Sequence, residues 1–184
     1  LNTLENYFNT TRFFAVGEIG IDLHWDKTYI NEQKKAFKIQ ISWAKKYHLP
    51  IVIHCRNSYE EIYEILKEES DENLRGVLHC FGGSANQAKK IIDLNFFLGI
   101  GGVVTYKNSN LKSVLEQIPI NKILIETDAP YLSPSPWRGK RNEPEFIKYT
   151  AQKICEIKNI SMQELTYQLY KNTKSLFFNQ NYLI

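Results

Sequence analysis

The stretch Ile51–Cys55 reads IVIHC, and the stretch Gly76–Cys80 reads GVLHC. Each is a short apolar run that ends in a histidine followed by a cysteine, and each lies between longer segments with a helical pattern. Short, nearly continuous apolar runs are typical of parallel strands that helices cover. The repeated pair therefore predicts two strands of an α/β sheet with the same geometry at their ends.

Further apolar runs and helical patterns surround these two strands. Their alternation predicts one α/β domain with a parallel sheet over residues 1–184. Helix starts are indicated by Ser84 and by two capping-box patterns, Ser58-x-x-Glu61 and Ser161-x-x-Glu164. The other predicted strands are Phe13–Ile21, Phe96–Val104 and Ile123–Thr127, and the predicted helices are Asn31–Tyr47, Ser58–Glu69, the segment after Ser84, Leu111–Gln117, Pro144–Ile157 and Met162–Tyr170.

The composition narrows the class of protein. Hydrophobic residues make up 43% of the chain and charged residues 23%, which is typical of a soluble folded protein. No apolar run approaches the length of a membrane helix, so we expect no membrane partner. A net charge of +3 is too small to indicate a nucleic-acid partner by itself. Three cysteines without a disulfide-like spacing favour a reducing, cytoplasmic location.

Four polar side chains coincide with strands. Glu18 lies in the first predicted strand, His54 and His79 end the next two, and Asp128 follows the last. Ligands bind at the carboxyl ends of parallel strands, so we expect these groups to converge. Alternation along each strand points each histidine towards the site and the following cysteine under the helices. It also places on one face the residues Val16, Glu18, Gly20 and Asp22, and likewise Leu124, Glu126 and Asp128.

Two histidines and several carboxylates on one face are unfavourable unless a cation neutralises them. The mixed ligand set suits zinc, manganese or magnesium. Alternatives remain for single residues: either histidine could be a hydrogen-bonded core residue, Glu18 a helix cap and Asp128 a turn residue. Glu126 lies deeper, and we predict that it accepts a hydrogen bond from a ligand histidine and orients its ring. The sequence leaves His24 undecided, and it favours a structural role for His48 at a helix end.

Several short motifs occur in order along the chain: GEIGID (Gly17–Asp22), IHCR (Ile53–Arg56), LHCF (Leu78–Phe81), ETDAPYL (Glu126–Leu132), RGKRNEP (Arg138–Pro144) and NTKSLF (Asn172–Phe177). In order and spacing they resemble the TatD family of metal-dependent deoxyribonucleases. The resemblance implies a TIM-type (β/α)8 barrel that binds two divalent ions (Mg, Mn or Zn) and takes DNA as its substrate. It implies that Glu18 bridges the ions, that His54 and His79 are ligands, and that Asp128 is a ligand and the base for the attacking water.

The sequence departs from the family pattern at its start. Family members open with a strand that carries a His-x-His motif and supplies two further ligands, and this sequence has no such motif. A full barrel has about 250 residues. We therefore expect the C-terminal five β/α units of a barrel, with the first three strands absent. The segment Leu1–Phe8 would then be the end of the helix that precedes the fourth strand.

The long segment Ala129–Glu143 follows the last predicted strand. Its basic residues Arg138, Lys140 and Arg141 could bind phosphates and Trp137 could stack on a base, but a solvated loop pinned by prolines explains them equally well. With the resemblance, Arg56, Tyr131 and Arg141 become candidate substrate contacts, although Arg141–Pro144 also suits a structural role. The expected activity is cleavage of DNA phosphodiester bonds, as a 3′–5′ exonuclease. The alternatives are another metal-dependent hydrolase, such as an esterase or amidase, and a truncated inactive remnant.

Overall fold

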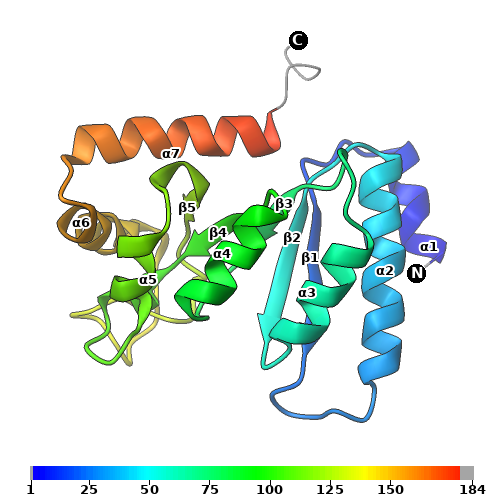
Figure 1. The fold of residues 1–184 in the computed structure, drawn as a ribbon, viewed down its shortest axis with the longest axis horizontal. Coiled ribbons are helices and arrows are strands. Elements are labelled where there is room, and N and C mark those ends of the chain that lie inside the picture. The colour runs from blue at the N-terminus through cyan, green and yellow to red at the C-terminus, as the bar shows by residue number, and fades with distance from the viewer. Residues whose placement is uncertain (1, 179–184) are drawn as a thin grey trace.

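The computed structural model describes residues 2–178, which form a five-stranded parallel sheet with the strand order β1-β2-β3-β4-β5 (Figure 1). The predicted parallel α/β sheet is thereby confirmed, whereas the eight-stranded barrel with three absent strands stays a prediction. None of the helices in the described part of the chain is long and apolar enough to cross a membrane. The strands are β1 Val16–Asp22, β2 Ile51–Arg56, β3 Gly76–Leu78, β4 Phe97–Ile100 and β5 Ile123–Ile125.

Helices alternate with these strands and continue after the last one. The first short helix α1 and the 3-10 turn η1 occupy the segment expected to be the end of a helix. The longest α-helices are α2, which follows β1, and α7 near the end of the described chain. The bounds are α1 Asn2–Glu5, η1 Asn6–Asn9, α2 Ile30–Lys46, α3 Tyr59–Glu68, α4 Ala85–Asp93, η2 Gly102–Thr105, α5 Leu111–Gln117, η3 Ile120–Lys122, η4 Pro144–Phe146, α6 Ile147–Lys158 and α7 Met162–Phe177.

The fourth strand is shorter than its apolar run predicts. β4 ends at Ile100, and the continuation of the run turns into the 3-10 helix η2. The segment after β5 packs closely here, because a Cβ atom on Gly102 would lie 2.5 Å from the carbonyl oxygen of Leu132. The apolar side chains of η2 are still used, since Val104 is buried in the main core. The apolar run in the sequence therefore could not show where the strand ends and the 3-10 helix begins.

The two faces of the sheet carry different apolar layers, because neighbouring residues of a strand point to opposite sides. On the face covered by α2, α3 and α4, Ile53 and Leu98 are fully buried in the main core (Figure 1). The other face forms a smaller cluster that Leu176 of α7 closes. Its strand residues are Val52, Val77, Phe97 and Leu124.

Helix α7 crosses the end of the sheet at which the strands begin (Figure 1). The side chain of Asn172 is buried, and its Nδ2 donates to the carbonyl oxygens of Ile120 at 2.9 Å and Ile123 at 2.7 Å. These bonds tie α7 to the start of β5. The helix continues to Phe177 rather than ending near Tyr170 as predicted. Its last turn packs on the smaller apolar cluster, through Leu176 and Phe177.

The predicted helix caps are confirmed at two of three places. Ser84 and Ser161 each form a capping box, with Gln87 and Glu164 as the partners. The capping box predicted at Ser58 is wrong. This hydroxyl is buried and donates to the carbonyl oxygen of Ile21 at 2.5 Å, so it joins the start of α3 to β1 instead of capping its own helix.

Candidate metal centre

The candidate site lies next to the smaller apolar cluster, on the same face of the sheet. Two residues beyond Val52, Val77 and Leu124 are His54, His79 and Glu126, which share the face of those residues because the side-chain period of a strand is two. The corresponding residue of β4 is Gly99. A Cβ atom there would lie 2.9 Å from Oε1 of Glu126, so the glycine makes room for this carboxylate. Local strand geometry therefore puts the polar groups in one layer.

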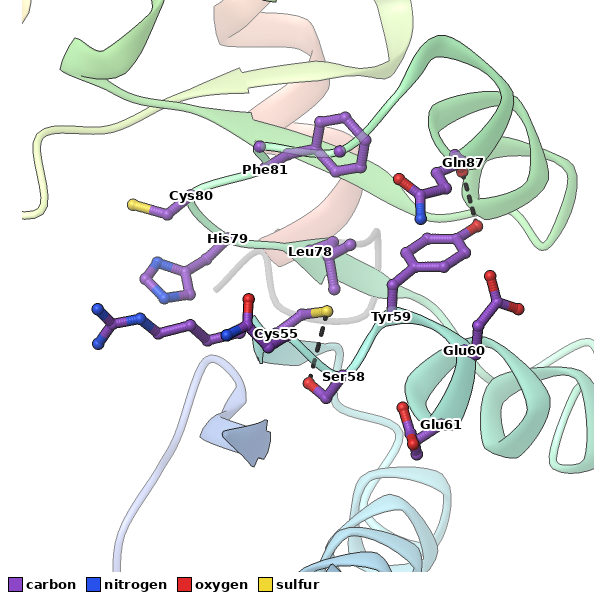
Figure 2. A pocket seen from close by; sticks show the side chains of 14 residues that line it. Cys55, Ser58, Tyr59, Glu60, Glu61, Leu78, His79, Cys80, Phe81 and Gln87 are labelled. Carbon is purple, nitrogen blue, oxygen red and sulfur yellow. Dashed lines mark hydrogen bonds between the residues drawn. The ribbon is translucent and has the colours of Figure 1, made fainter. Parts of the chain in front are cut away.

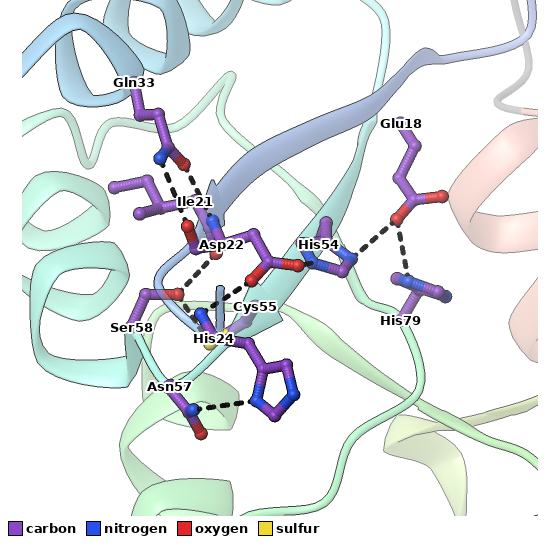
Figure 3. A network of polar contacts seen from close by, with 10 residues as sticks. All are labelled: Glu18, Ile21, Asp22, His24, Gln33, His54, Cys55, Asn57, Ser58 and His79. Carbon is purple, nitrogen blue, oxygen red and sulfur yellow. Dashed lines mark hydrogen bonds and ion pairs between the residues drawn. The ribbon is translucent and has the colours of Figure 1, made fainter. Parts of the chain in front are cut away.

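Glu18 brings the two histidines together. Its Oε1 lies 2.8 Å from Nε2 of His79 and 3.0 Å from Nδ1 of His54 (Figure 3). The two imidazole ring centroids are 5.7 Å apart. Ligand atoms of all three residues lie within 4.8 Å of one another, a grouping that could hold a metal ion. Three of the four predicted ligands therefore lie together: Glu18 on β1, His54 on β2 and His79 directly after β3.

A bulge in β1 sets the direction of Glu18. The register with β2 shifts between Val16 and Ile19. Val16 therefore packs in the main core with Ile19 and Ile21, and its predicted place on the face of Glu18 is wrong. The extra residue of a bulge reorients the side chains on either side of it. Only Glu18 and the alternate residues beyond it face the site.

Asp128 approaches the group from the segment after β5. It lines a pocket of about 560 Å³ together with Glu18, His54 and His79, but it is not part of the 4.8 Å grouping. Its backbone is in the left-handed region, with φ at 55°. Burial raises the pKa of the Asp128 carboxyl, with the nearby carboxylates of Glu126 and Glu18 adding to the shift.

Glu126 lies beside His79, but it contacts the ring less closely than predicted. Its Oε2 is 3.7 Å from Nδ1 of His79, a separation typical of an ion pair and longer than a hydrogen bond. Its Oε1 accepts a hydrogen bond from the backbone N–H of Cys80. The adjacent Glu126 carboxylate outweighs the effect of burial and raises the pKa of His79.

Asp22 is a site residue that the sequence placed on the right face without giving it a role. Its Oδ2 lies 2.9 Å from Nε2 of His54, on the opposite side of the ring from Glu18 (Figure 3). Its Oδ1 accepts from the backbone N–H of His24 at 2.8 Å. Gln33 of α2 holds the backbone of Asp22 with two hydrogen bonds, at 2.8 and 3.1 Å. The alternation Glu18, Gly20, Asp22 was the signal that could have identified it.

The two cysteines after the histidines behave differently. Cys55 packs against the main core as predicted, with its Sγ 3.8 Å from the Ser58 hydroxyl (Figure 2). For Cys80 the prediction is wrong, because β3 ends at Leu78 and the backbone of Cys80 turns to a φ of 45°. Its Sγ comes within 4.8 Å of ligand atoms of His79 and Glu126. Burial and the nearby carboxylates raise the pKa of the Cys80 thiol, which favours its protonated form.

The remaining candidates divide into two groups. Arg56 and Tyr131 line the pocket, and Tyr131 is 70% exposed. Arg141 is exposed but does not line it. Trp137 stacks on Phe146 with ring centroids 5.3 Å apart and has a buried Nε1, so one face of its ring is already occupied.

The two histidines outside the metal grouping also have defined surroundings. The Nδ1 of His24 faces Nδ2 of Asn57 at 3.3 Å (Figure 3). His48 has a φ of 54° and lies between the end of α2 and β2, and its carbonyl oxygen accepts from Arg75 at 2.9 Å. Neither belongs to the groupings that could hold a metal.

The donor set fits a divalent cation. One carboxylate oxygen lies between two imidazole nitrogens, and three further carboxylates, those of Asp22, Glu126 and Asp128, surround them. Carboxylate and imidazole together suit zinc or manganese, and carboxylates alone suit magnesium. A cation would offset the repulsion among these carboxylates.

Comparisons with known proteins identify the family. The model of the family described as "TatD related DNase" matches residues 1–178. The uncharacterized metal-dependent hydrolase YabD of Bacillus subtilis is 47% identical over 164 residues, which are 89% of this chain and 64% of that protein. The uncharacterized metal-dependent hydrolase BU355 of Buchnera aphidicola is 38% identical over 96% of this chain and 70% of its own length. This chain thus spans only part of the length of either relative.

Solved structures agree with the sequence matches. The crystal structure of YjjV, a TatD homologue of Escherichia coli, superposes with a TM-score of 0.90 at 31% identity, covering 96% of this chain and 69% of that one. A TatD-family hydrolase of Entamoeba histolytica gives a TM-score of 0.80 at 27% identity, covering 96% and 67%. The resemblance inferred from the ordered motifs is thereby confirmed, and the chain belongs to the TatD-related DNase family.

Proposed function

We propose that this protein is a divalent-metal-dependent hydrolase that cleaves phosphodiester bonds of DNA, as a 3′–5′ exonuclease. The observation that carries the proposal is the position of one Glu18 oxygen between a nitrogen of His54 and a nitrogen of His79, inside a pocket that Asp128 also lines. The family is described by its DNase activity, and the relatives are named metal-dependent hydrolases. Both support a hydrolytic role for this pocket.

Each residue of the pocket has a role in the proposal. Glu18, His54, His79 and Asp128 would hold two ions (Mg, Mn or Zn), with Glu18 shared between them. Bound there, the metal would lower the pKa of a water and stabilise negative charge on the phosphodiester. Asp128 would accept the proton of the attacking water, since its carboxylate lines the same pocket as Glu18, His54 and His79.

The surrounding residues orient the ligands and the substrate. Asp22 keeps the proton of His54 on Nε2, which leaves Nδ1 with its lone pair towards Glu18. Arg56 and Tyr131 contact the substrate from the walls of the pocket, the guanidinium through a phosphate. A cytoplasmic location completes the proposal, supported by three free cysteines.

The test is cleavage of a single-stranded oligonucleotide labelled at its 5′ end. Chelation should abolish cleavage and Mn²⁺ should restore it. His54→Ala should lower kcat/KM at least about 100-fold, because changing only a partner of a ligand typically costs about 10–100-fold. His48→Asn is the matched control: it removes a histidine remote from the pocket, and asparagine tolerates a positive φ.

Two outcomes would contradict the proposal. One is DNA cleavage by His54→Ala at the wild-type rate. The other is hydrolysis of carboxylic esters or amides, in a parallel panel, by a protein that leaves DNA intact, which would favour the esterase or amidase alternative. A ladder of products that shortens from the 3′ end supports the exonuclease mode, and internal fragments argue against it.

A further inference from the structure

Trp25 stands exposed at the rim of the candidate metal centre. It follows β1 by three residues, in the segment that leads to α2. Its exposed fraction is 83%, the largest among the large hydrophobic side chains in the described part of the chain. The other two tryptophans are placed differently: Trp43 is buried and Trp137 is stacked on Phe146. An indole this exposed contributes little to the packing of the core, so its packing does not explain why a tryptophan occupies this position.

Neighbouring side chains hold the ring in place. The imidazole of His24 meets it edge-on, with centroids 4.6 Å apart and an interplanar angle of 81°. The guanidinium carbon of Arg56 lies 5.7 Å from the ring centroid, within cation–π range. His24 is itself fixed, by a hydrogen bond from its backbone N–H to Asp22 and a contact with Asn57. These contacts place the ring beside the guanidinium of Arg56.

Arg56 connects this ring to the metal pocket. Its side chain lines the pocket that contains Glu18, His54 and Asp128. It also lines the adjoining pocket of about 460 Å³ at the start of α3, shown in Figure 2. Moving outwards from the site, the order is thus carboxylate and histidine ligands, then a guanidinium, then an exposed aromatic face.

This order matches the chemistry of an unpaired DNA strand, in which phosphates and bases alternate. A guanidinium binds phosphate oxygens through two donors, and any base can stack on an aromatic face. We propose that Trp25 is the stacking platform for the base of the nucleotide next to the scissile phosphodiester, with Arg56 on its phosphate. This inference rests on the proposed nuclease function.

Intrinsic fluorescence tests the platform without turnover. Wild-type protein, with its metal removed by a chelator, is titrated with single-stranded oligo(dT). The bases of this oligonucleotide quench the fluorescence of an indole on which they stack. We expect saturable quenching in the wild type and its loss in Trp25→Phe, because Trp43 is buried and Trp137 is already stacked on Phe146. Quenching of equal amplitude in Trp25→Phe would overturn the proposal, and so would an absence of quenching in the wild type.

Kinetics test the same subsite during cleavage. Trp25→Ala should lower the ratio of kcat/KM for oligo(dT) to kcat/KM for methyl p-nitrophenyl phosphate, a substrate without a base, by about 5–150-fold. Trp25→Phe should restore most of the ratio. Tyr167→Ala is the matched control, because Tyr167 is also exposed (64%) but lies on α7.

The outcomes separate this inference from the nuclease function on which it rests. An unchanged ratio in Trp25→Ala, with DNA still cleaved, would overturn the platform and leave the nuclease function standing. Saturable quenching that requires Trp25, in a protein that cleaves no DNA with any metal, would support base stacking on Trp25 and refute the nuclease function.

Discussion

Replacing Asp22 by asparagine changes the hydrogen bonding around His54 while keeping the size of the side chain. In the protein, one carboxylate oxygen accepts from the backbone N–H of His24 at 2.8 Å and the other lies 2.9 Å from Nε2 of His54. A carboxamide has only one oxygen, and its other group is a donor. If the oxygen stays with His24, the NH2 group faces Nε2 and drives the proton of His54 to Nδ1.

That proton would then lie on the side of Glu18, because Nδ1 is the nitrogen 3.0 Å from Oε1 of Glu18. A histidine must present an unprotonated nitrogen to a metal, so Asp22→Asn acts against binding. A hydrogen bond to a charged group contributes about 1.5–3 kcal/mol, which corresponds to about 10–150-fold in an equilibrium constant. We therefore expect the affinity for Mn²⁺ to fall by about 10–150-fold.

The assay is calorimetric titration of the metal-free protein with Mn²⁺, together with a thermal melt of each variant. Asp26→Asn is the matched control, because the Oδ1 of Asp26 also accepts a backbone N–H two residues ahead, that of Thr28 at 2.8 Å, and it contacts no histidine. We expect the control to bind Mn²⁺ like the wild type. Wild-type affinity in a folded Asp22→Asn protein would refute the reasoning that the Asp22 carboxylate orients His54.

Two further predictions concern the support beneath the site. Asn172→Ala removes two hydrogen bonds to buried backbone carbonyls and should lower the free energy of unfolding by about 2–4 kcal/mol in urea titrations, and a loss under about 0.5 kcal/mol would contradict the role given to it. Gly99→Ala places a methyl group 2.9 Å from Oε1 of Glu126, so the carboxylate must move. We expect weaker Mn²⁺ binding by calorimetry with only a small change in melting temperature, and unchanged binding would show that the position of Glu126 does not matter.

The strands of the sheet and the layer of His54, His79 and Glu126 could be predicted from the sequence. Both follow from a local rule, the alternation of side chains along a strand, together with the convergence of parallel strand ends. The rule succeeds here because β2 runs without a bulge through His54 and because the chain at His79 still follows the ladder, donating to the carbonyl of Ile53 at 3.0 Å. The order of the motifs was enough to identify the family.

The same rule fails where the backbone leaves regular geometry. The bulge in β1 moves Val16 to the opposite face, and the positive φ of Cys80 turns its thiol towards Glu126. Gly17 lies inside the shifted stretch of β1, and a glycine within a strand pattern can signal a bulge, but it does not tell which neighbouring side chains change face. The backbone there is set by what packs against it.

The partners of polar side chains were likewise decided only in three dimensions. Ser58 was expected to cap its own helix but donates to Ile21, 37 residues away, and Trp137 was a candidate for base stacking but packs on Phe146. Asp22 received its partner His54 from 32 residues away. Alternation and capping patterns are properties of neighbouring residues, so the sequence by itself determined them wherever the backbone stays regular, as at His54, Ser84 and Ser161. A hydrogen-bond partner or an exposed ring depends on which distant segments meet, and only the tertiary structure decides that.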